Sequence, residues 1–316
     1  MMVNAVCIFC NKSSNCTAIE EEGYTARRCA QCGLIYVSPR PSLEQTRQLY
    51  MRQKARASVG TDMSGALSKR LHAKHNLGIL KKYAKKGALL EIGTGAGYFL
   101  NEAKREGFDV CGIELNNVQA DFIRRERGIP CEDSPLSRSS FGGKTFDVVY
   151  HCNVMSHFYD PLAEFKRINS KLRNKGVLIF QTGNVGDVSR KYYDMFTTFQ
   201  LPDHLFLFGE NTVKELLRRS GFECMEIRRY SILPELAIQR ILKRITGHKG
   251  RRTNKGASNE AGHVHASASS CIGWCGKAIK NIYHRLSHLI RYRVGYVMPK
   301  RGRPQTAVYV ARKVSE

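Results

Sequence analysis

The chain has 316 residues, 42% of them hydrophobic, a composition that excludes a disordered chain and leaves room for one large α/β domain with a small appendage. No apolar run is long enough to cross a membrane, and the N-terminus lacks a secretory pattern, so a cytoplasmic protein is expected. The net charge is +24, of which residues 226–316 supply +15. Such a region attracts the phosphates of nucleic acids, lipid headgroups or sugar phosphates, although a solvated basic surface would give the same composition.

Four cysteines near the N-terminus have the spacing of a zinc ribbon. Cys7 and Cys10 form one C-x2-C pair, and Cys29 and Cys32 form a second pair after eighteen intervening residues. Two such turns bring four thiolates to one tetrahedral Zn²⁺. We therefore expect residues 1–40 to form a zinc ribbon with a structural metal, because protein thiolates fill all four coordination positions. Four unrelated buried thiols are the alternative interpretation.

Residues 41–84 are expected to form a helical linker or lid. Two prolines in "VSPRPSLEQTRQLY" come first, and residues 64–85 then place leucines along one side of a helix. From residue 85 to residue 230, strand and helix patterns alternate. The expected strands are "GALLEIG", "FDVCGIE", "FDVVYHC", "GVLIFQT" and "FECMEIRRY", and the expected helices are 97–106, 117–127, 161–173 and 212–220. This alternation predicts an α/β, doubly wound and mostly parallel sheet, with its ligand at the turns that follow the strands.

The turn in "LLEIGTGAGYFL", residues 89–100, follows the first of these strands and carries Gly93, Gly95 and Gly97. A dinucleotide fingerprint would need a third glycine where this chain has Tyr98, and a phosphate-binding P-loop would need a G-K-[ST] ending. The turn resembles instead the first motif of class I S-adenosylmethionine-dependent methyltransferases, in which an apolar strand and an acidic residue precede G-x-G-x-G.

The resemblance covers about residues 85–230, with a last strand at "QTAVYVARK" within residues 305–316. It implies a Rossmann-like seven-stranded sheet, mostly parallel with an antiparallel last strand, and S-adenosyl-L-methionine as cofactor. The cofactor-binding residues that it implies are Glu91, Gly93, Thr94, Gly95, Gly97, Glu114, Leu115, Asp133 and Asn153.

The resemblance implies individual roles for four of these positions. Glu114 stands where the family places the carboxylate that holds the ribose hydroxyls. Glu91 adds negative charge near the cationic end of the cofactor, or else accepts backbone hydrogen bonds within the turn. Asp133 matches the position that approaches the adenine, with Glu132 as an equal candidate. Asn153 would line the floor of the cofactor site.

Two histidines are candidate proton acceptors. His157 and His204 both lie in loops expected at the carboxyl edge of the sheet, and histidine titrates where the deprotonation of a hydroxyl would use it. Asp203 could orient His204. In the "leH" pattern of the family, Ser156 replaces the usual acidic neighbour. Each histidine could also be structural or simply solvated.

Residues 231–304 are expected to form a basic helical insertion before the last strand. The stretch "PELAIQRILKRI" and a helix at about 272–293 each place apolar residues on one face. One interpretation is a substrate lid packed on the domain. The other is contact with a membrane, the protein being peripheral at the inner membrane surface. A second metal site is disfavoured because its surroundings look like a loop; its ligands would be His263, His265, Cys271 and Cys275.

The "PDHLFLFGENTVKELLRRSGFE" stretch and the ribbon resemble the branch of the family that carries an N-terminal zinc ribbon. The sequence therefore predicts a methyltransferase of glycan or small-molecule biosynthesis, acting on a hydroxyl of a sugar or of a lipid-linked or phosphate-linked intermediate. The alternative is an rRNA or tRNA methyltransferase whose ribbon and basic tail grip phosphates, although "NVMSH" stands where an N/D-P-P-Y type of motif would. A non-catalytic binding module is the third hypothesis, and the intact glycine turn argues against it.

Overall fold

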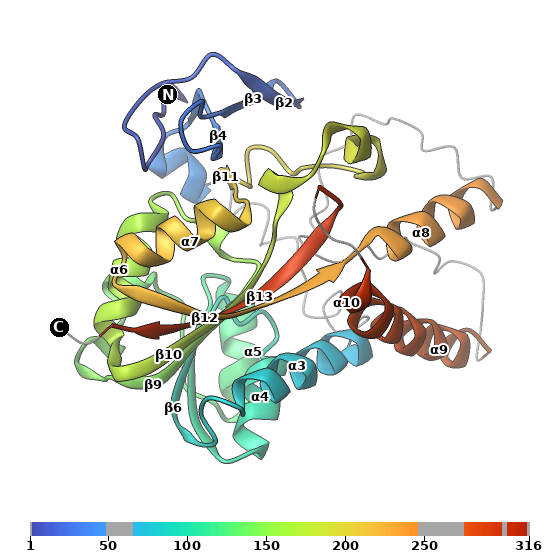
Figure 1. The fold of residues 1–316 in the computed structure, drawn as a ribbon. Coiled ribbons are helices and arrows are strands. Elements are labelled where there is room, and N and C mark those ends of the chain that lie inside the picture. Colours follow the sequence, from blue (N-terminus) through green and yellow to red (C-terminus); the bar gives the residue numbers. More distant parts are fainter. Residues whose placement is uncertain (1, 49–65, 246–274, 299–301, 315–316) are drawn as a thin grey trace.

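A computed structural model describes residues 2–48, 66–245, 275–298 and 302–314 (Figure 1). Its central sheet has the strand order β12-β13-β10-β9-β6-β7-β8. The pairs between β10, β9, β6, β7 and β8 are parallel, and β13 is antiparallel to both β10 and β12. The strands are β6 Gly87–Ile92, β7 Phe108–Ile113, β8 Cys131–Glu132, β9 Phe146–Cys152, β10 Leu172–Gly183, β12 Phe222–Ser231 and β13 Gln305–Lys313. This confirms the seven-stranded Rossmann-like sheet with an antiparallel last strand.

Helices cover both faces of the central sheet (Figure 1). Successive strand residues point to opposite faces, so the neighbours Leu89 and Leu90 are both fully buried, but in different cores. One core contains side chains of α3, α4 and α5, and the other contains side chains of α6 and α7. The helices are α3 Ala66–Leu80, α4 Tyr98–Arg105, α5 Asn117–Arg127, α6 Pro161–Lys171 and α7 Glu210–Arg219.

Local signals explain where these helices begin and end. The side chain of Asn116 accepts hydrogen bonds from the second and third backbone N–H groups of α5, and Gly128 ends that helix in the left-handed region at φ 55°. Asp160 caps α6 in the same way, with a proline in the first helical position. The helix expected at 161–173 stops at Lys171 because Leu172 already belongs to β10.

The N-terminal segment and the α/β domain share a second sheet, which has four strands. Its strand order is β11-β4-β3-β2, and β11 comes from the region between β10 and α7. Across this junction, the Glu21 carboxylate accepts hydrogen bonds from the backbone N–H groups of Phe199 and Leu201, both at 2.8 Å. The N-terminal segment therefore supports the loop that leads to His204. The strands are β1 Met2–Val3, β2 Thr17–Glu21, β3 Tyr24–Arg28, β4 Ile35–Val37, β5 Arg40–Pro41 and β11 Phe206–Leu207, and β1 pairs with β5.

The described part of the insertion is helical and lies against α3 and β12. It comprises α8 Leu233–Ile245, α9 Cys275–Leu289, a π-helical turn Ile290–Val294 and α10 Gly295–Val297. Tyr292 is buried and stacks on His75 of α3, with ring centroids 3.7 Å apart. Of the four residues considered for a second metal site, three precede the described range and the fourth, Cys275, is the first residue of α9. Within the described ranges, no helix combines the length and apolarity needed to span a bilayer.

His151 of β9 is a fully buried histidine inside an aromatic cluster. Its ring stacks on Phe180, with centroids 4.8 Å apart, and meets the edge of Phe165 at 5.7 Å. Neither ring nitrogen has a hydrogen-bond partner among the residues that the structure describes. Burial lowers the pKa of His151 to about 3, so the folded protein holds this ring neutral.

This neutral ring makes stability depend on pH. An unfolded histidine binds a proton below about pH 6.5, whereas folded His151 does not until about pH 3. The free-energy cost of keeping His151 neutral is therefore absent above about pH 6.5. It grows by about 1.4 kcal/mol per pH unit as the pH falls toward 3. We expect His151→Phe, which keeps an aromatic ring, to reduce the slope of unfolding free energy against pH between about pH 4 and 6. The reduction should be about 1.4 kcal/mol per pH unit, the value for one bound proton. Urea titrations at several pH values measure this, and an unchanged slope would contradict it.

Candidate cofactor and acceptor site

The turn between β6 and α4 has a backbone that only glycine adopts readily. Gly93, Gly95 and Gly97 have φ of 72°, 54° and 70°. A Cβ atom on Gly93 would lie 2.5 Å from a methyl carbon of Val154, so a side chain there is excluded. Gly93, Thr94 and Gly95 border a cavity on their other side, so a ligand there can approach the backbone of the turn.

Glu114 ties the end of β7 to this turn. Its side chain is 2% exposed. One carboxylate oxygen accepts a hydrogen bond from the backbone N–H of Gly95 at 2.8 Å, and the other accepts one from Asn116 at 2.9 Å. The carboxylate thereby holds the glycine turn and the segment after β7 together.

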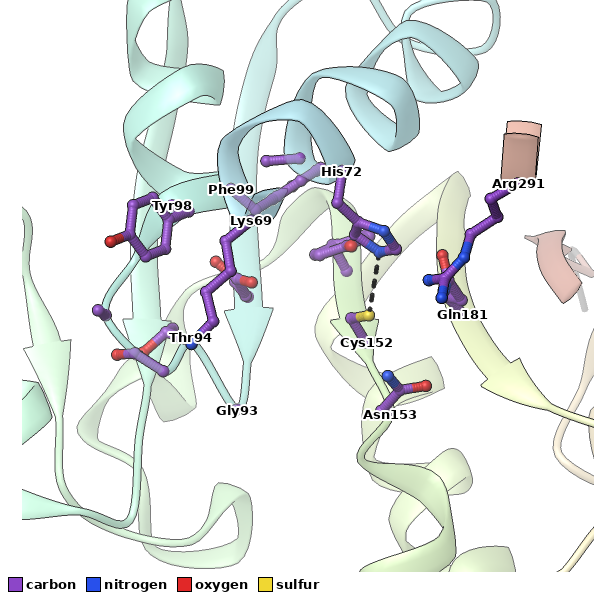
Figure 2. Close-up of a pocket in the computed structure, with 15 residues that line it drawn as sticks. Lys69, His72, Gly93, Thr94, Tyr98, Phe99, Cys152, Asn153, Gln181 and Arg291 are labelled. Carbon is purple, nitrogen blue, oxygen red and sulfur yellow. Dashed lines mark hydrogen bonds between the residues drawn. The ribbon is translucent and has the colours of Figure 1, made fainter. Parts of the chain in front are cut away.

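A cavity opens beside the turn, at the carboxyl ends of β6, β9 and β10. Figure 2 shows side chains from α3 entering it from one side and Arg291 of the π-helical turn approaching from the other. Its lining combines the glycine turn, the end of β9, the α3 helix and the insertion. The lining residues are Lys69, His72, Ala73, Glu91, Gly93, Thr94, Gly95, Ala96, Tyr98, Phe99, Tyr150, Cys152, Asn153, Gln181 and Arg291.

Five of the nine residues expected at the cofactor line this cavity, namely Glu91, Gly93, Thr94, Gly95 and Asn153. Asn153 has a positive φ of 54°, an uncommon conformation for a residue other than glycine. The other four are not part of the lining: Gly97 caps α4, Glu114 and Leu115 follow the neighbouring strand β7, and Asp133 is exposed just after β8.

Glu91 is the acidic residue of the turn motif and has an unusual environment. It is 4% exposed, and its Oε2 atom has no hydrogen-bond partner in the described structure. Burial, reinforced by the nearby charge of Glu114, raises the pKa of Glu91 well above its usual value, although a backbone hydrogen bond from Leu100 opposes this. A buried acceptor beside an open cavity fits a ligand that brings a positive charge or a donor.

The two expected proton acceptors lie together, away from this lining. The rings of His157 and His204 have centroids 4.8 Å apart. His157 Nδ1 lies 3.1 Å from the Asp203 carbonyl oxygen and 3.3 Å from its carboxylate. His204 Nδ1 lies 2.9 Å from the carbonyl oxygen of Phe199, and burial lowers the pKa of His204 to about 4. Both residues border the junction with the N-terminal sheet, and neither is among the residues that line the cavity.

The cavity contains a histidine that the sequence analysis did not single out. His72 Nδ1 lies 2.5 Å from the hydroxyl of Tyr292, and its Nε2 lies 3.2 Å from Asn76 Nδ2. Nε2 also lies 3.5 Å from Cys152 Sγ (Figure 2). Burial, reinforced by the charge of Arg291, lowers the pKa of His72 to about 3. The ring is therefore neutral at pH 7 and fixed in orientation.

Sequence spacing could have revealed this polar face of α3. Lys69, His72 and Asn76 recur at i, i+3 and i+7, on the face of the helix that turns toward the sheet. Asn76 is fully buried and donates to the Tyr150 hydroxyl and to Gln181 Oε1. Polar residues at helical spacing among leucines indicate a lined site rather than a simple core face.

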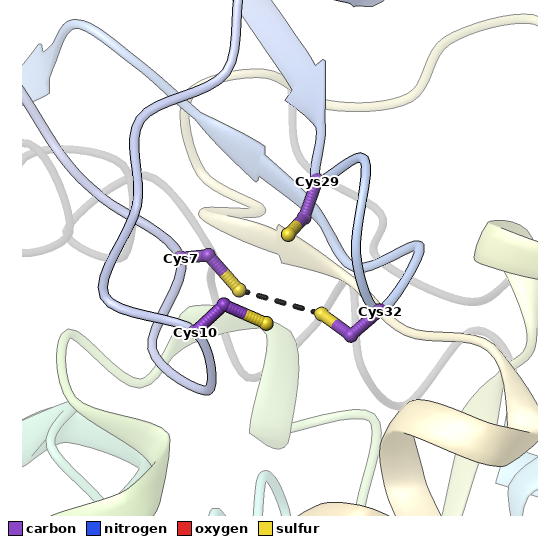
Figure 3. A group of neighbouring side chains, drawn as sticks. All are labelled: Cys7, Cys10, Cys29 and Cys32. Carbon is purple, nitrogen blue, oxygen red and sulfur yellow. Dashed lines mark hydrogen bonds between the residues drawn. The ribbon is translucent and has the colours of Figure 1, made fainter.

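The four-cysteine cluster forms a compact site in the N-terminal segment (Figure 3). All four sulfur atoms lie within 4.8 Å of one another, and those of Cys7 and Cys32 are 3.4 Å apart. Tetrahedral Zn²⁺ with bonds of about 2.3 Å separates its sulfur ligands by about 3.8 Å. Burial alone would raise the pKa of Cys29, but backbone N–H donors of Cys32 and Gln31 lower it to about 7. The donor set and its size fit a structural zinc ion.

The strand order and the glycine turn after β6 define an α/β domain of the Rossmann-like class. The family described as "Methyltransferase domain" matches residues 61–227, more than half of the chain. The chain belongs to this family, in agreement with the resemblance of its turn to class I S-adenosylmethionine-dependent methyltransferases.

Individual relatives are distant. A ubiquinone biosynthesis O-methyltransferase of Actinobacillus pleuropneumoniae is 26% identical over 106 residues, 30% of this chain and 45% of the relative. A tRNA U34 carboxymethyltransferase of Campylobacter jejuni is 28% identical over 154 residues, 43% of this chain and 50% of the relative. The chain thus spans about half the length of the curated relatives it matches. The solved phosphoethanolamine N-methyltransferase 2 of Haemonchus contortus aligns with 77% of this chain and 53% of its own, at 16% identity and a TM-score of 0.46.

Proposed function

We propose that this protein is an S-adenosylmethionine-dependent methyltransferase that methylates a hydroxyl group of a small acceptor carrying an anionic group, such as a sugar phosphate or a lipid-linked intermediate. The supporting observation is that one cavity combines the glycine turn with two cationic side chains, Lys69 and Arg291. The bound cofactor supplies a methyl group on a sulfonium, and the protein mainly has to align it with the acceptor. Family membership supports this class of chemistry.

In this proposal the open backbone at Gly93, Thr94 and Gly95 holds the methionine portion of the cofactor. Glu114, bonded to Gly95, supplies the carboxylate for the ribose hydroxyls. The unpartnered Oε2 of Glu91 faces the cationic end. The remaining expected contacts, at the adenine side and along the turn, are Gly97, Leu115, Asp133 and Asn153.

A histidine is the proposed proton acceptor, and three are candidates. His157 and His204 are expected from the sequence. His72 is the one that lines the cavity, and Nε2 of its neutral ring would accept the hydrogen bond of an acceptor hydroxyl in exchange for its contact with Cys152 Sγ. Even a weakly basic imidazole is far more basic than the protonated ether that would otherwise form, so its low pKa does not prevent this role. Comparing His72→Gln, His157→Gln and His204→Gln in one transfer assay identifies which histidine supports kcat.

Arg291 is the proposed contact for the anionic group of the acceptor. Its Nε and Nη2 atoms pair with the Glu235 carboxylate at 2.9 and 2.5 Å, which fixes one edge of the guanidinium. Burial alone would lower its pKa, but pairing with Glu235 raises it above the usual value, so Arg291 stays charged. The insertion thereby brings a permanent cation to the cavity.

We expect Arg291→Gln to lower kcat/KM for phosphate-bearing acceptors by about tenfold to a hundredfold, because a charged hydrogen bond is worth roughly 1.5–3 kcal/mol. Transfer of labelled methyl from S-adenosylmethionine to a panel of sugar phosphates and their dephosphorylated forms measures this. Arg285→Gln, an exposed position on the same helical segment, should leave the rate unchanged. Equal loss on acceptors with and without phosphate would contradict the assignment of Arg291.

An RNA acceptor is the second candidate. The net charge of +24 and the tRNA-modifying relative favour it. In that function the zinc ribbon and the basic tail would contact phosphates. Methyl transfer to rRNA or tRNA alone, and to no small acceptor of the panel, would replace the proposed function by this one.

A further inference from the structure

The C-terminal helical segment, residues 275–297, leaves an apolar face exposed. Ile282, Leu286 and Leu289 are 58%, 52% and 54% exposed and recur at i, i+4 and i+7, on one side of α9. Val294 and Val297, 46% and 77% exposed, continue the apolar exposure to the end of α10. We name these five residues the α9 stripe.

The opposite side of the same segment is firmly packed. His284 and Tyr292 are 3% and 7% exposed. A Cβ atom on Gly295 would lie 2.5 Å from the carbonyl oxygen of Ser231, so the backbone of α10 touches β12 directly. This packing fixes the segment, with α9 at the edge of the molecule beside α3 (Figure 1). The segment already packs on the domain through its other side, so the stripe is not the face that buries it against the central sheet.

The charge around the stripe has one sign. Residues 275–297 contain five Lys and Arg and no Asp or Glu. Arg285 and Arg293 are exposed, and neither makes a salt bridge within the described residues. The contrast is α7, where Glu215 pairs with Arg218 and Arg219 on the helix surface. An apolar face flanked by unbalanced cations suits the boundary between anionic headgroups and acyl chains.

We infer that the α9 stripe docks this protein on an anionic lipid bilayer. A second copy of the chain would bring like charges together. The chain segment 246–274 carries four Lys and Arg against one Glu, so it too would bring like charge to the face. RNA would account for the cations, and Tyr296, 51% exposed, offers a base one ring, but RNA would leave the five aliphatic side chains of the stripe in water. Anionic lipid matches both the charge and the apolar surface.

This surface lies on the segment that also reaches the cavity. Arg291 lines the cavity, while Leu289 and Val294 on either side of it are exposed. A bilayer under the stripe would thus lie close to the acceptor side of the site. The inference goes beyond the proposed function, because bilayer binding is measured without any acceptor.

The test is sedimentation of the full-length protein with vesicles of phosphatidylcholine alone and of phosphatidylcholine mixed with phosphatidylglycerol. Wild type is expected to bind the anionic vesicles, and less so at high salt. Leu286→Glu/Leu289→Glu should reduce the vesicle partition coefficient by at least about tenfold, because burial of one leucine side chain alone is worth that factor. The matched control is Val118→Glu/Met225→Glu, which makes the same charge change at residues 50% and 41% exposed elsewhere. It should retain most of the binding.

Four outcomes would overturn the inference. Wild type could ignore anionic vesicles, or the stripe variant could bind them as well as the control does. Binding of single-stranded RNA without vesicle binding would assign the cations to nucleic acid. A wild-type dimer that the stripe variant abolishes, again without vesicle binding, would assign the stripe to a second copy. Calorimetric binding of S-adenosylmethionine by the same samples tests the proposed function without vesicles, and their melting temperatures report folding.

Discussion

Glu114→Ala is expected to lower the affinity for S-adenosylmethionine by at least about a hundredfold. The variant removes the carboxylate proposed to hold two ribose hydroxyls, and a hydrogen bond to a charged group is worth roughly 1.5–3 kcal/mol. It also frees the backbone N–H of Gly95, to which the carboxylate is bonded at 2.8 Å. Both losses act on the cofactor, the first directly and the second through the shape of the turn. Isothermal titration calorimetry measures the affinity.

Two further variants separate these contributions. Glu114→Gln keeps one acceptor oxygen, but its amide N–H donors would face either Asn116 or Gly95, both of which donate to this side chain. We expect it to bind the cofactor more weakly than wild type and more tightly than the alanine variant. Glu126→Ala, an exposed acid on α5, should bind as wild type does. Unchanged affinity in Glu114→Ala, with a normal melting temperature, would show that the carboxylate does not contact the cofactor.

The core of this fold could be predicted because its strands and helices carry strong local signals. Apolar runs such as residues 87–92 end at glycine turns, and Asn116 and Asp160 cap their helices through their own side chains. β8 gave no such signal, because a strand of two residues, Cys131–Glu132, is too short to show an alternating pattern. The additional strand β11 pairs with β4 across a long sequence separation, which no local pattern encodes.

The residues proposed to hold the cofactor stand in a recognisable sequence motif, whereas Arg291 and His72, proposed to face the acceptor, do not. The turn residues Gly93 and Gly95 and the carboxylate of Glu114 lie within one β-α-β unit, so a short motif records their arrangement. Arg291 reaches the cavity only because the insertion packs on α3, through contacts such as Tyr292 with His75. His72 belongs to a helix that precedes the sheet, and the helical spacing of Lys69, His72 and Asn76 marks a polar face without showing which cavity that face lines. Packing between distant segments decides that placement.

Cys29→Ser is expected to abolish stable zinc binding and to loosen the N-terminal sheet. We propose that the four-cysteine cluster holds one structural zinc ion, and a unit of about 40 residues depends on such a metal because it buries too little apolar surface alone. Zinc binding stabilises comparable small domains by roughly 10 kcal/mol or more, so loss of one of four ligands should be the most damaging single change in this segment. Metal analysis of the purified protein should find one zinc ion per chain in wild type and far less in the variant.

The shared sheet predicts how far this damage extends. β11 pairs with β4, and Glu21 of β2 holds the backbone of Phe199 and Leu201, so loss of the metal should reach the loop that carries His204. Hydrogen exchange should therefore accelerate in β2–β4 and in residues 199–207 while β6 and β9 stay protected, since one of the two cores of the central sheet contains no residue of the N-terminal segment. The matched control is Cys16→Ser, an exposed cysteine of the same segment outside the cluster, which should keep its zinc and its protection. Equal behaviour of the two variants would mean that the four thiols serve packing alone, and that the core supports His204 without the metal.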